Sequence, residues 1–196
     1  MKKIVVNNKY RTVIYNPEKK IYEKILRPKL KEKIKIFLRM KRPHGINADY
    51  ITKLLKKNGI KTYEVLSYTK YSYITKEVKG KTLIEKIIEI KNDKEKINMY
   101  LKKYMEIIKK VINLNLCYTD FNFNNVIINE KDEVCLIDID EMQDTWYCRI
   151  LKNEEVIKRL NKNLYGECSR LKGLKIKSDA EEIISDCISD IIRNNT

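Results

Sequence analysis

Three side chains late in the chain have the types and spacing needed to hold a metal ion and move a proton. Asp120 is followed five residues later by Asn125, and Asp138 comes directly after a predicted β-hairpin over residues 126–137. Folding of this hairpin returns Asp138 to the neighbourhood of Asp120 and Asn125. Two carboxylates and one amide offer hard oxygen ligands, which suit Mg²⁺ that also holds phosphate. A carboxylate that is not a ligand can accept a hydroxyl proton.

This arrangement resembles the protein-kinase-like superfamily, in which a catalytic loop H-x-D-x-x-x-x-N is followed by a β-hairpin and a D-F-G-type aspartate. The resemblance implies that Asp120 is the catalytic aspartate and that Asn125 and Asp138 bind Mg²⁺. It implies ATP as the second cofactor. It also implies an α+β, protein-kinase-like two-lobed fold with a β-rich N-lobe and a helical C-lobe.

Upstream residues extend the resemblance. Lys24, on a predicted strand, matches the lysine that holds the α- and β-phosphates and that the family pairs with a glutamate of the next helix, a glutamate that this chain lacks. In this chain that helix offers Asp49 as the partner of Lys24, or Asn47 as a neutral acceptor. The segment after the last predicted strand of the N-lobe resembles the hinge that binds adenine through backbone groups, which implies contacts at Lys76 and Val78.

Three departures from the family pattern keep a non-catalytic kinase fold as an alternative. Tyr118 replaces the histidine of the catalytic loop, which is a mostly structural residue. Residues 4–15 contain no glycine, so backbone amides would cover the phosphates less closely than in a glycine-rich loop. Asp138 is followed by Ile139 and Asp140, so the glycine of D-F-G is absent.

The residues in and around the catalytic loop narrow the choice of kinase subfamily. Asn122 occupies the position where Ser/Thr protein kinases usually carry lysine, and no A-P-E sequence follows Asp138. Residues 21–29 and the basic segment after them resemble lipopolysaccharide core heptose kinases, and the resemblance covers residues 10–165. It implies transfer of the γ-phosphate of ATP to a sugar hydroxyl of the lipopolysaccharide inner core. Other small-molecule and protein kinases share the loop and remain an alternative.

The chain is strongly basic. It has 42 Lys and Arg against 27 Asp and Glu, a net charge of +15, and residues 19–42 hold eleven basic residues and two glutamates. Such a field attracts phosphate groups, which fits a phosphorylated glycan acceptor and peripheral contact with an anionic membrane. The alternatives are a solvated basic surface or a non-catalytic basic binding protein. Nucleic acid is not expected, because the 13 tyrosines are spread through the chain and form no stacking platform.

Apolar periodicity and turn residues predict the elements that must position these side chains. Strands are predicted over residues 10–15, 21–26, 62–67 and 71–78, and helices over residues 46–58, 92–115, 144–163 and 178–193. Gly59 is predicted to end the first of these helices. We expect an N-terminal lobe over residues 1–79 and a helical C-terminal lobe over residues 80–196.

Length and composition predict where such a protein works. The 196 residues suit one domain or one compact two-lobed domain. No apolar run approaches the ~20 residues that cross a bilayer, and the N-terminus does not have the pattern of a signal peptide. We therefore expect a cytoplasmic protein, with peripheral contact on the inner face of the inner membrane. Five cysteines and a single histidine, His44, predict reduced, buried thiols and neither a zinc site nor a disulfide framework.

Overall fold

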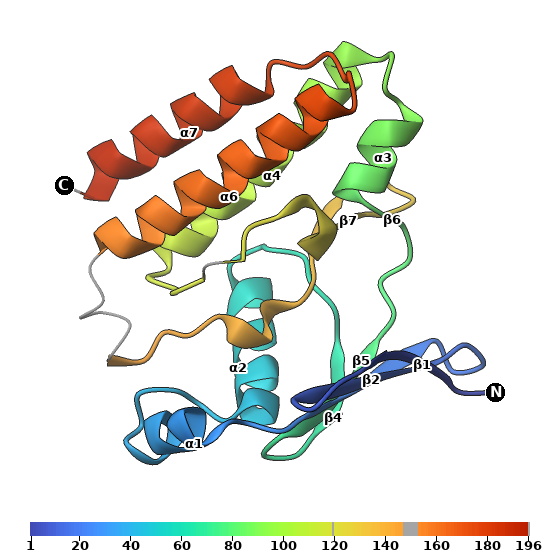
Figure 1. Cartoon of the computed structure of the whole chain (residues 1–196), viewed down its shortest axis with the longest axis vertical. Coiled ribbons are helices and arrows are strands. Elements are labelled where there is room, and N and C mark those ends of the chain that lie inside the picture. Colours follow the sequence, from blue (N-terminus) through green and yellow to red (C-terminus); the bar gives the residue numbers. More distant parts are fainter. Residues whose placement is uncertain (119, 147–152, 196) are drawn as a thin grey trace.

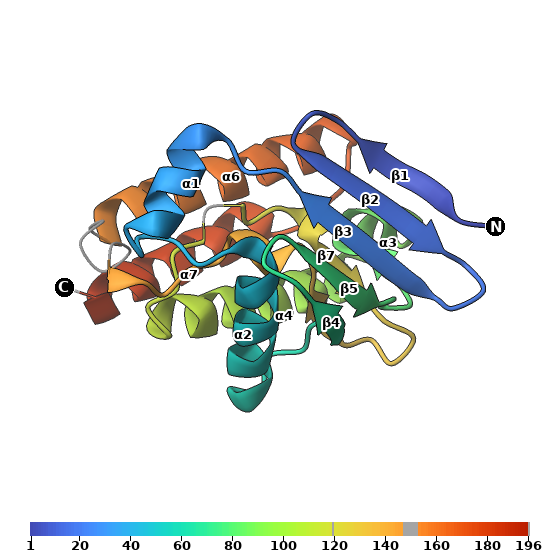
Figure 2. The same cartoon turned by 90° about the horizontal axis from the view of Figure 1, so that it is seen from below.

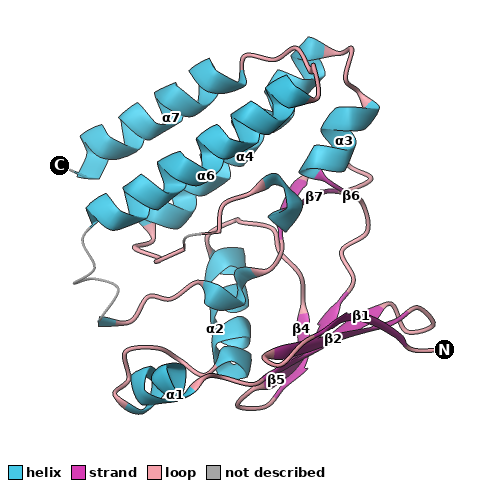
Figure 3. Cartoon of the chain, viewed as in Figure 1, coloured by secondary structure: helices cyan, strands magenta, loops and turns pink. Residues whose placement is uncertain are grey.

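The computed structural model describes residues 1–118, 120–146 and 153–195, and its architecture is α+β (Figure 1). A five-stranded antiparallel sheet lies at one end of the molecule, and long helices lie at the other (Figure 3). A second antiparallel sheet, of three short strands, lies between them. This arrangement is compatible with the two-lobed layout that we expected.

The five-stranded sheet forms from segments rich in aromatic and β-branched residues, which favour strands. The strand order is β1-β2-β3-β5-β4, and each neighbouring pair is antiparallel. The strands are β1 (Lys3–Asn7), β2 (Arg11–Asn16), β3 (Ile21–Leu26), β4 (Val65–Tyr68) and β5 (Ser72–Lys76). Lys24 lies opposite Val13 on one side and Tyr73 on the other. Because β3 is the central strand, hydrogen bonds to both neighbours hold the backbone of Lys24 in place.

The connection between β3 and β4 carries helix α2 (His44–Lys57), which contacts β4 and β5. Ala48, Ile51 and Leu55 are fully buried, and their spacing of three and four residues gives α2 a single apolar face. The helix ends at Asn58, and Gly59 follows with φ of +71°. This confirms the helix end that the glycine predicted.

The helical end of the molecule contains α3 (Leu83–Glu89), α4 (Lys94–Asn113), α6 (Asn153–Gly173) and α7 (Ala180–Asn195). Helices α4, α6 and α7 lie side by side in both views (Figures 1 and 2). The predicted apolar stripe of α4 is buried in full, at Ile97, Leu101, Tyr104, Ile108 and Val111. Within the described residues, none of the helices combines the length and the apolar composition that crossing a bilayer requires.

The small sheet contains the predicted hairpin. Its strands are β6 (Lys81–Thr82), β7 (Val126–Ile128) and β8 (Val134–Leu136), with β7 in the middle. Two short 3₁₀ turns flank the hairpin, η1 (Phe123–Asn125) before β7 and η2 (Ile139–Glu141) after β8. Because Val126 is paired with Leu136, the segment that enters the hairpin lies beside the segment that leaves it.

Several elements differ from the prediction. The helix predicted over residues 144–163 is wrong in its bounds, since α6 begins at Asn153 and continues through Gly166 to Gly173. The apolar stripe continues past the predicted end, with Leu164, Cys168 and Leu171 all buried. Residues 147–152 of that prediction lie outside the described residues. The elements β1, β6 and α3 were not predicted, because they are short or, in β1, mostly exposed.

The cysteines are placed largely as expected. Cys135, Cys168 and Cys187 are buried and Cys117 is partly buried, whereas Cys148 lies outside the described residues. Burial raises the pKa of Cys168 to about 11 and that of Cys187 to about 12. These two thiols therefore stay protonated and unreactive at neutral pH.

We predict that Gly45→Ala destabilises the protein, because α2 packs too closely on the β4–β5 turn for a side chain. A Cβ at this position would lie 2.0 Å from the carbonyl oxygen of Thr69 and 2.4 Å from that of Ser72. Overpacking of this kind lowers the free energy of unfolding by about 1–3 kcal/mol. The matched control is Gly166→Ala in α6, where a Cβ would meet no atom within 4 Å and should stabilise the helix by about 0.5–1 kcal/mol. Urea denaturation of both variants measures the difference, and an equal effect of the two would contradict the close packing of α2.

Candidate functional site

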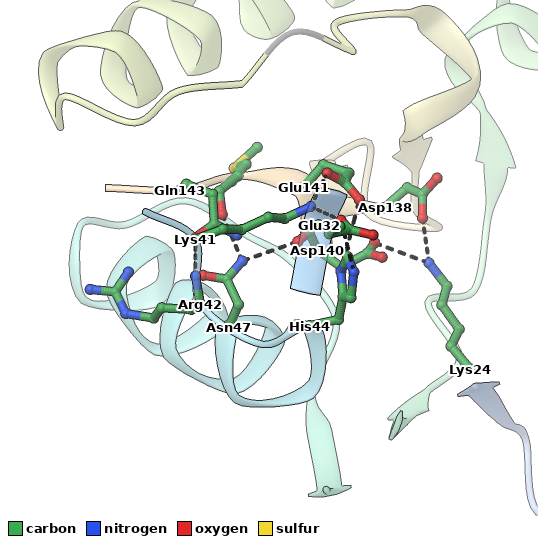
Figure 4. Close-up of polar contacts among 11 residues, drawn as sticks. Lys24, Glu32, Lys41, Arg42, His44, Asn47, Asp138, Asp140, Glu141 and Gln143 are labelled. Carbon is green, nitrogen blue, oxygen red and sulfur yellow. Dashed lines mark hydrogen bonds and ion pairs between the residues drawn. The ribbon is translucent and has the colours of Figure 1, made fainter. Parts of the chain in front are cut away.

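The candidate site is built around an ion pair between the central strand of the large sheet and the segment that leaves the hairpin (Figure 4). The ammonium group of Lys24 binds a carboxylate oxygen of Asp138 and lies 3.5 Å from a carboxylate oxygen of Asp140. The Lys24 side chain is 18% exposed and that of Asp140 only 9%. One ammonium therefore neutralises two carboxylates that lie two residues apart in the chain.

Asp138 has a left-handed backbone, with φ of 57° and ψ of 41°. This conformation is uncommon for a residue with a side chain, although aspartate tolerates it better than most. Such backbone strain is often found at functional sites. Here it occurs directly after β8, at the residue whose carboxylate pairs with Lys24.

The ion pair keeps its members charged. Burial alone would raise the pKa of Asp140, but the Lys24 ammonium and hydrogen bonds to the carboxylate together outweigh this effect and hold the pKa below its ordinary value. Burial likewise opposes the charge of Lys24, and the two carboxylates overcome it, so the pKa of Lys24 is raised. Lys24 and Asp140 therefore both stay charged at neutral pH.

Asp120 is exposed and held in orientation by two amides of its own loop. Asn122 donates to one carboxylate oxygen and Asn125 to the other, each at 2.8 Å. The side-chain oxygen of Asn122 in turn accepts from the backbone N–H groups of Asn124 (2.9 Å) and Asn125 (3.2 Å), which caps η1. The predicted spacing between Asp120 and Asn125 thus corresponds to a direct contact.

Tyr118 links this loop to the hairpin exit. It is 2% exposed, its hydroxyl donates to the carbonyl of Asp138 at 3.5 Å, and it accepts from the Asn125 amide at 3.3 Å. Burial raises the pKa of Tyr118 far above its ordinary value, so the hydroxyl remains a neutral donor. Tyr118 therefore has a structural role between Asn125 and Asp138.

Two cavities meet at this site and share Arg11 and Asp138 in their linings. The smaller cavity, of about 280 Å³, is lined by Lys24, Asn125 and Asp138 together with Lys76 and Val78. The larger, of about 520 Å³, is lined by Asp120, Asp138 and Asp140. Its basic lining residues are Arg11, Arg27, Lys29, Lys31, Lys35, Lys41 and His44. Five carboxylates share this lining, from Glu32 and Glu141 as well as the three aspartates, so acidic and basic side chains face the larger cavity together.

The predicted pairing of Asp49 with Lys24 is wrong. Asp49 accepts from Lys53 at 2.8 Å, one turn further along α2. The buried residue of α2 at the site is Asn47, whose amide donates to the carbonyls of Asp140 (3.0 Å) and Met142 (2.6 Å). Residues two apart on a helix point in different directions, so only one of Asn47 and Asp49 can reach the site. The carboxylates that neutralise Lys24 come instead from the chain after β8.

Arg11 was missed by the sequence analysis. It follows the tight turn between β1 and β2, where the Asn8 side chain accepts from the backbone N–H groups of Tyr10 (2.9 Å) and Arg11 (2.8 Å). These two amides are already engaged and cannot cover a phosphate. The available positive charge is the guanidinium of Arg11, which lines both cavities. The signal that could have identified Arg11 is its position in a turn without glycine, where the family has a glycine-rich loop.

A second polar cluster lies beside the site and also escaped the sequence analysis. Ligand atoms of Glu32, His44 and Glu141 lie within 4.8 Å of one another. The Lys41 ammonium lies between the two carboxylates, 2.5 Å from Glu32 and 2.8 Å from Glu141 (Figure 4). Lys41 therefore supplies the positive charge that these carboxylates need, and the cluster ties α2 to the segment after Asp138.

Comparison with protein-family models and with curated protein sequences finds no match to this chain. Any function must therefore be inferred from the residues of the site and their geometry.

We predict that Lys24→Met lowers the free energy of unfolding by about 3 kcal/mol at neutral pH, because it leaves Asp140 buried without its counter-charge. An unpaired buried carboxylate binds a proton more readily than the same group in the unfolded chain. Its pKa in the variant therefore rises above the unfolded value, and the destabilisation should shrink as the pH is lowered toward about 5.

The matched control is Lys53→Met, which removes the exposed partner of Asp49 on the surface of α2. It should leave the denaturation midpoint unchanged. Urea titrations of both variants at neutral and acidic pH make the comparison. A similar loss in both, or a loss in Lys24→Met that does not depend on pH, would contradict the buried ion pair.

Proposed function

We propose that this chain is an ATP-dependent phosphotransferase with a protein-kinase-like fold, which transfers the γ-phosphate to a sugar hydroxyl of the lipopolysaccharide inner core, as heptose kinases do. The observation that carries the proposal is the convergence of Lys24, Asp120, Asn125 and Asp138 at one point where two cavities meet. These residues come from a central strand, a loop before a hairpin and the exit of that hairpin, the order expected for phosphoryl transfer on this fold.

The smaller cavity is proposed to bind the nucleotide. Its wall includes the apolar side chains of Val13, Ile127 and Ile137, which suit the faces of a base. Lys76 and Val78 lie along the same wall. The backbone N–H of Lys76 already donates to the carbonyl of Glu64 at 2.9 Å. The proposed adenine contacts are therefore the carbonyl of Lys76 and the N–H of Val78.

The donor set of the site fits Mg²⁺. Asn125 and Asp138 offer an amide and a carboxylate oxygen, both hard ligands of the kind that binds Mg²⁺ together with phosphate. When bound, the metal would neutralise charge on the phosphates. Lys24 would add a fixed positive charge, and Asp140 would remain as its carboxylate partner when Asp138 is engaged elsewhere. In this proposal Asp140 replaces the glutamate that the superfamily supplies from the helix.

Asp120 is proposed to orient the acceptor hydroxyl and to accept its proton. Its two amide contacts, from Asn122 and Asn125, hold the carboxylate in one orientation at the wall of the larger cavity. Positioning of this kind accounts for most of the catalysis in phosphoryl transfer. The Lys and Arg side chains of this lining, such as Arg27, Lys29 and Lys31, would bind an acceptor that already carries phosphate groups, as inner-core glycans do.

Two observations favour a second candidate, a kinase-like protein that does not catalyse transfer. Lys24 pairs directly with Asp138, and the turn between β1 and β2 uses its own amides to bind Asn8. A phosphotransferase must separate Lys24 from Asp138 when nucleotide binds, whereas a non-catalytic protein can keep the pair closed. Nucleotide binding and transfer together distinguish these two candidates.

The first test is Mg²⁺-dependent ATP binding, measured by calorimetry. Asp138→Ala removes one proposed metal ligand and should weaken binding by about tenfold or more, about 1.4 kcal/mol. Asp120→Ala should leave ATP affinity unchanged and lower transfer to inner-core oligosaccharide by about 10²–10⁴-fold. Asp49→Ala is the matched control and should leave both unchanged. Absence of ATP binding at millimolar concentrations would reject the nucleotide site, and binding without any transfer would favour the non-catalytic candidate.

The second test concerns Arg11. If its guanidinium takes the role of a glycine-rich loop, Arg11→Ala should weaken ATP binding by about tenfold, because a charge-assisted contact to phosphate is lost. Lys9→Ala removes a basic residue of the same turn that lines neither cavity, and it should leave the affinity unchanged. Equal effects of the two variants would show only the general influence of positive charge and would contradict a direct contact by Arg11.

A further inference from the structure

Helix α1 (Leu30–Phe37) turns its apolar side chains outward. None of its residues is buried. Leu30 is 75% exposed, Ile34 50% and Phe37 84%, and Leu38, the C-cap residue, is 53% exposed. Their spacing of four, three and one residues places all four on one side of the helix. The result is an apolar strip on the surface of the protein.

The opposite side of α1 carries Glu32 and the half-buried Ile36, and Glu32 is fixed to the protein. Glu32 accepts from Lys41 at 2.5 Å, and the Nε2 atom of His44 lies 3.1 Å from the same carboxylate oxygen. His44 is only 3% exposed in its side chain, so this contact is anchored in the protein interior. A helix on a globular protein normally buries its apolar side. In α1 the contacts of Glu32 with Lys41 and His44 instead hold the helix with its apolar strip facing solvent.

Basic residues flank the apolar strip. Lys31 and Lys33 are exposed on its two borders, and Lys29 and Arg39 lie beyond its two ends. The Lys29 ammonium lies 4.2 Å from the ring centroid of Tyr10, which ties the start of the helix to the sheet. An apolar strip with Leu and Phe between lysines is the composition of helices that lie in the interface of an anionic membrane.

We propose that α1 docks on the surface of an anionic lipid bilayer, with Leu30, Ile34, Phe37 and Leu38 inserted between the headgroups and the lysines in contact with lipid phosphates. An anionic bilayer fits this surface because its negative headgroups complement the lysines that flank the apolar strip. A second copy of the chain would bring the same net charge of +15 and another set of lysines to the contact. Nucleic acid would match the lysines but would leave the apolar strip in water.

The docking surface adjoins the proposed acceptor cavity. Lys29 and Lys31 line the cavity of about 520 Å³ that contains Asp120, and both belong to the segment that borders the strip. Figure 1 shows α1 at the edge of the molecule, at the opposite end from α3. Docking would therefore hold the cavity close to the bilayer, where the headgroup of a glycolipid could enter it. This last step rests on the proposed phosphotransferase function, whereas the docking itself does not.

The test is co-sedimentation of the full chain with vesicles of phosphatidylcholine alone and of phosphatidylcholine mixed with phosphatidylglycerol, without nucleotide. We expect binding to the mixed vesicles to be at least about tenfold stronger. The variant Leu30→Ser/Phe37→Ser should weaken this binding by about tenfold, because two inserted side chains are lost. Lys31→Glu/Lys33→Glu should abolish the preference for the anionic vesicles.

The matched control is Ile88→Ser/Leu174→Ser. Both side chains are 46% exposed and lie outside α1, so vesicle binding should be unchanged. Equal binding to both vesicle types, or equal losses in the two serine variants, would overturn the proposal. So would a dimer of the wild-type chain that Leu30→Ser/Phe37→Ser converts to a monomer, since a second copy would then cover the strip. Mg²⁺-ATP binding of Leu30→Ser/Phe37→Ser should match wild type, and loss of ATP binding in every form of the chain would reject the phosphotransferase and leave the docking standing.

Discussion

The arrangement depends on one buried positive charge. Lys24 lies on the central strand of the large sheet, and among the described residues its ammonium is compensated by the two carboxylates after β8. A buried charge without a partner is far more costly than an exposed one. The ion pairs therefore stabilise the contact between the sheet and the hairpin exit, because moving one from the other would leave charges unpaired. Both cavities lie at this junction.

Helix α2 reinforces the junction without contributing a charge. Its buried Asn47 donates to the carbonyls of Asp140 and Met142, which satisfies backbone acceptors in a turn that no sheet partner covers. The amide of Asn47 is neutral, whereas an acidic residue at this position would add a third carboxylate to those of Asp138 and Asp140. In this chain the helix positions the backbone of the hairpin exit, and the hairpin exit supplies the carboxylate.

Much of the fold and of the site follows from local patterns in the sequence. The hairpin, helices α2 and α4, and the meeting of Asp120, Asn125 and Asp138 were predicted, because spacing and periodicity determine which face a residue occupies. The partner of Lys24 was predicted wrongly. Asn47, four residues before Ile51, lies on the buried side of α2, whereas Asp49 does not. That the carboxylates beside Lys24 come from the chain after β8 depends on how distant elements pack, which local spacing does not show. The exposed apolar side of α1 was not predicted, because apolar spacing on a helix indicates a stripe but not whether the stripe faces the interior.

The Lys41 bridge has a consequence for how the surface and the site communicate. One ammonium contacts Glu32 on α1 and Glu141 three residues after Asp138, so displacement of α1 would disturb an ion pair of the turn that follows Asp138. Displacement of the surface helix and disorder at the aspartate are therefore linked energetically. Such linkage is reciprocal: any contact that steadies α1 also steadies Asp138, and a ligand that orders Asp138 strengthens whatever α1 holds.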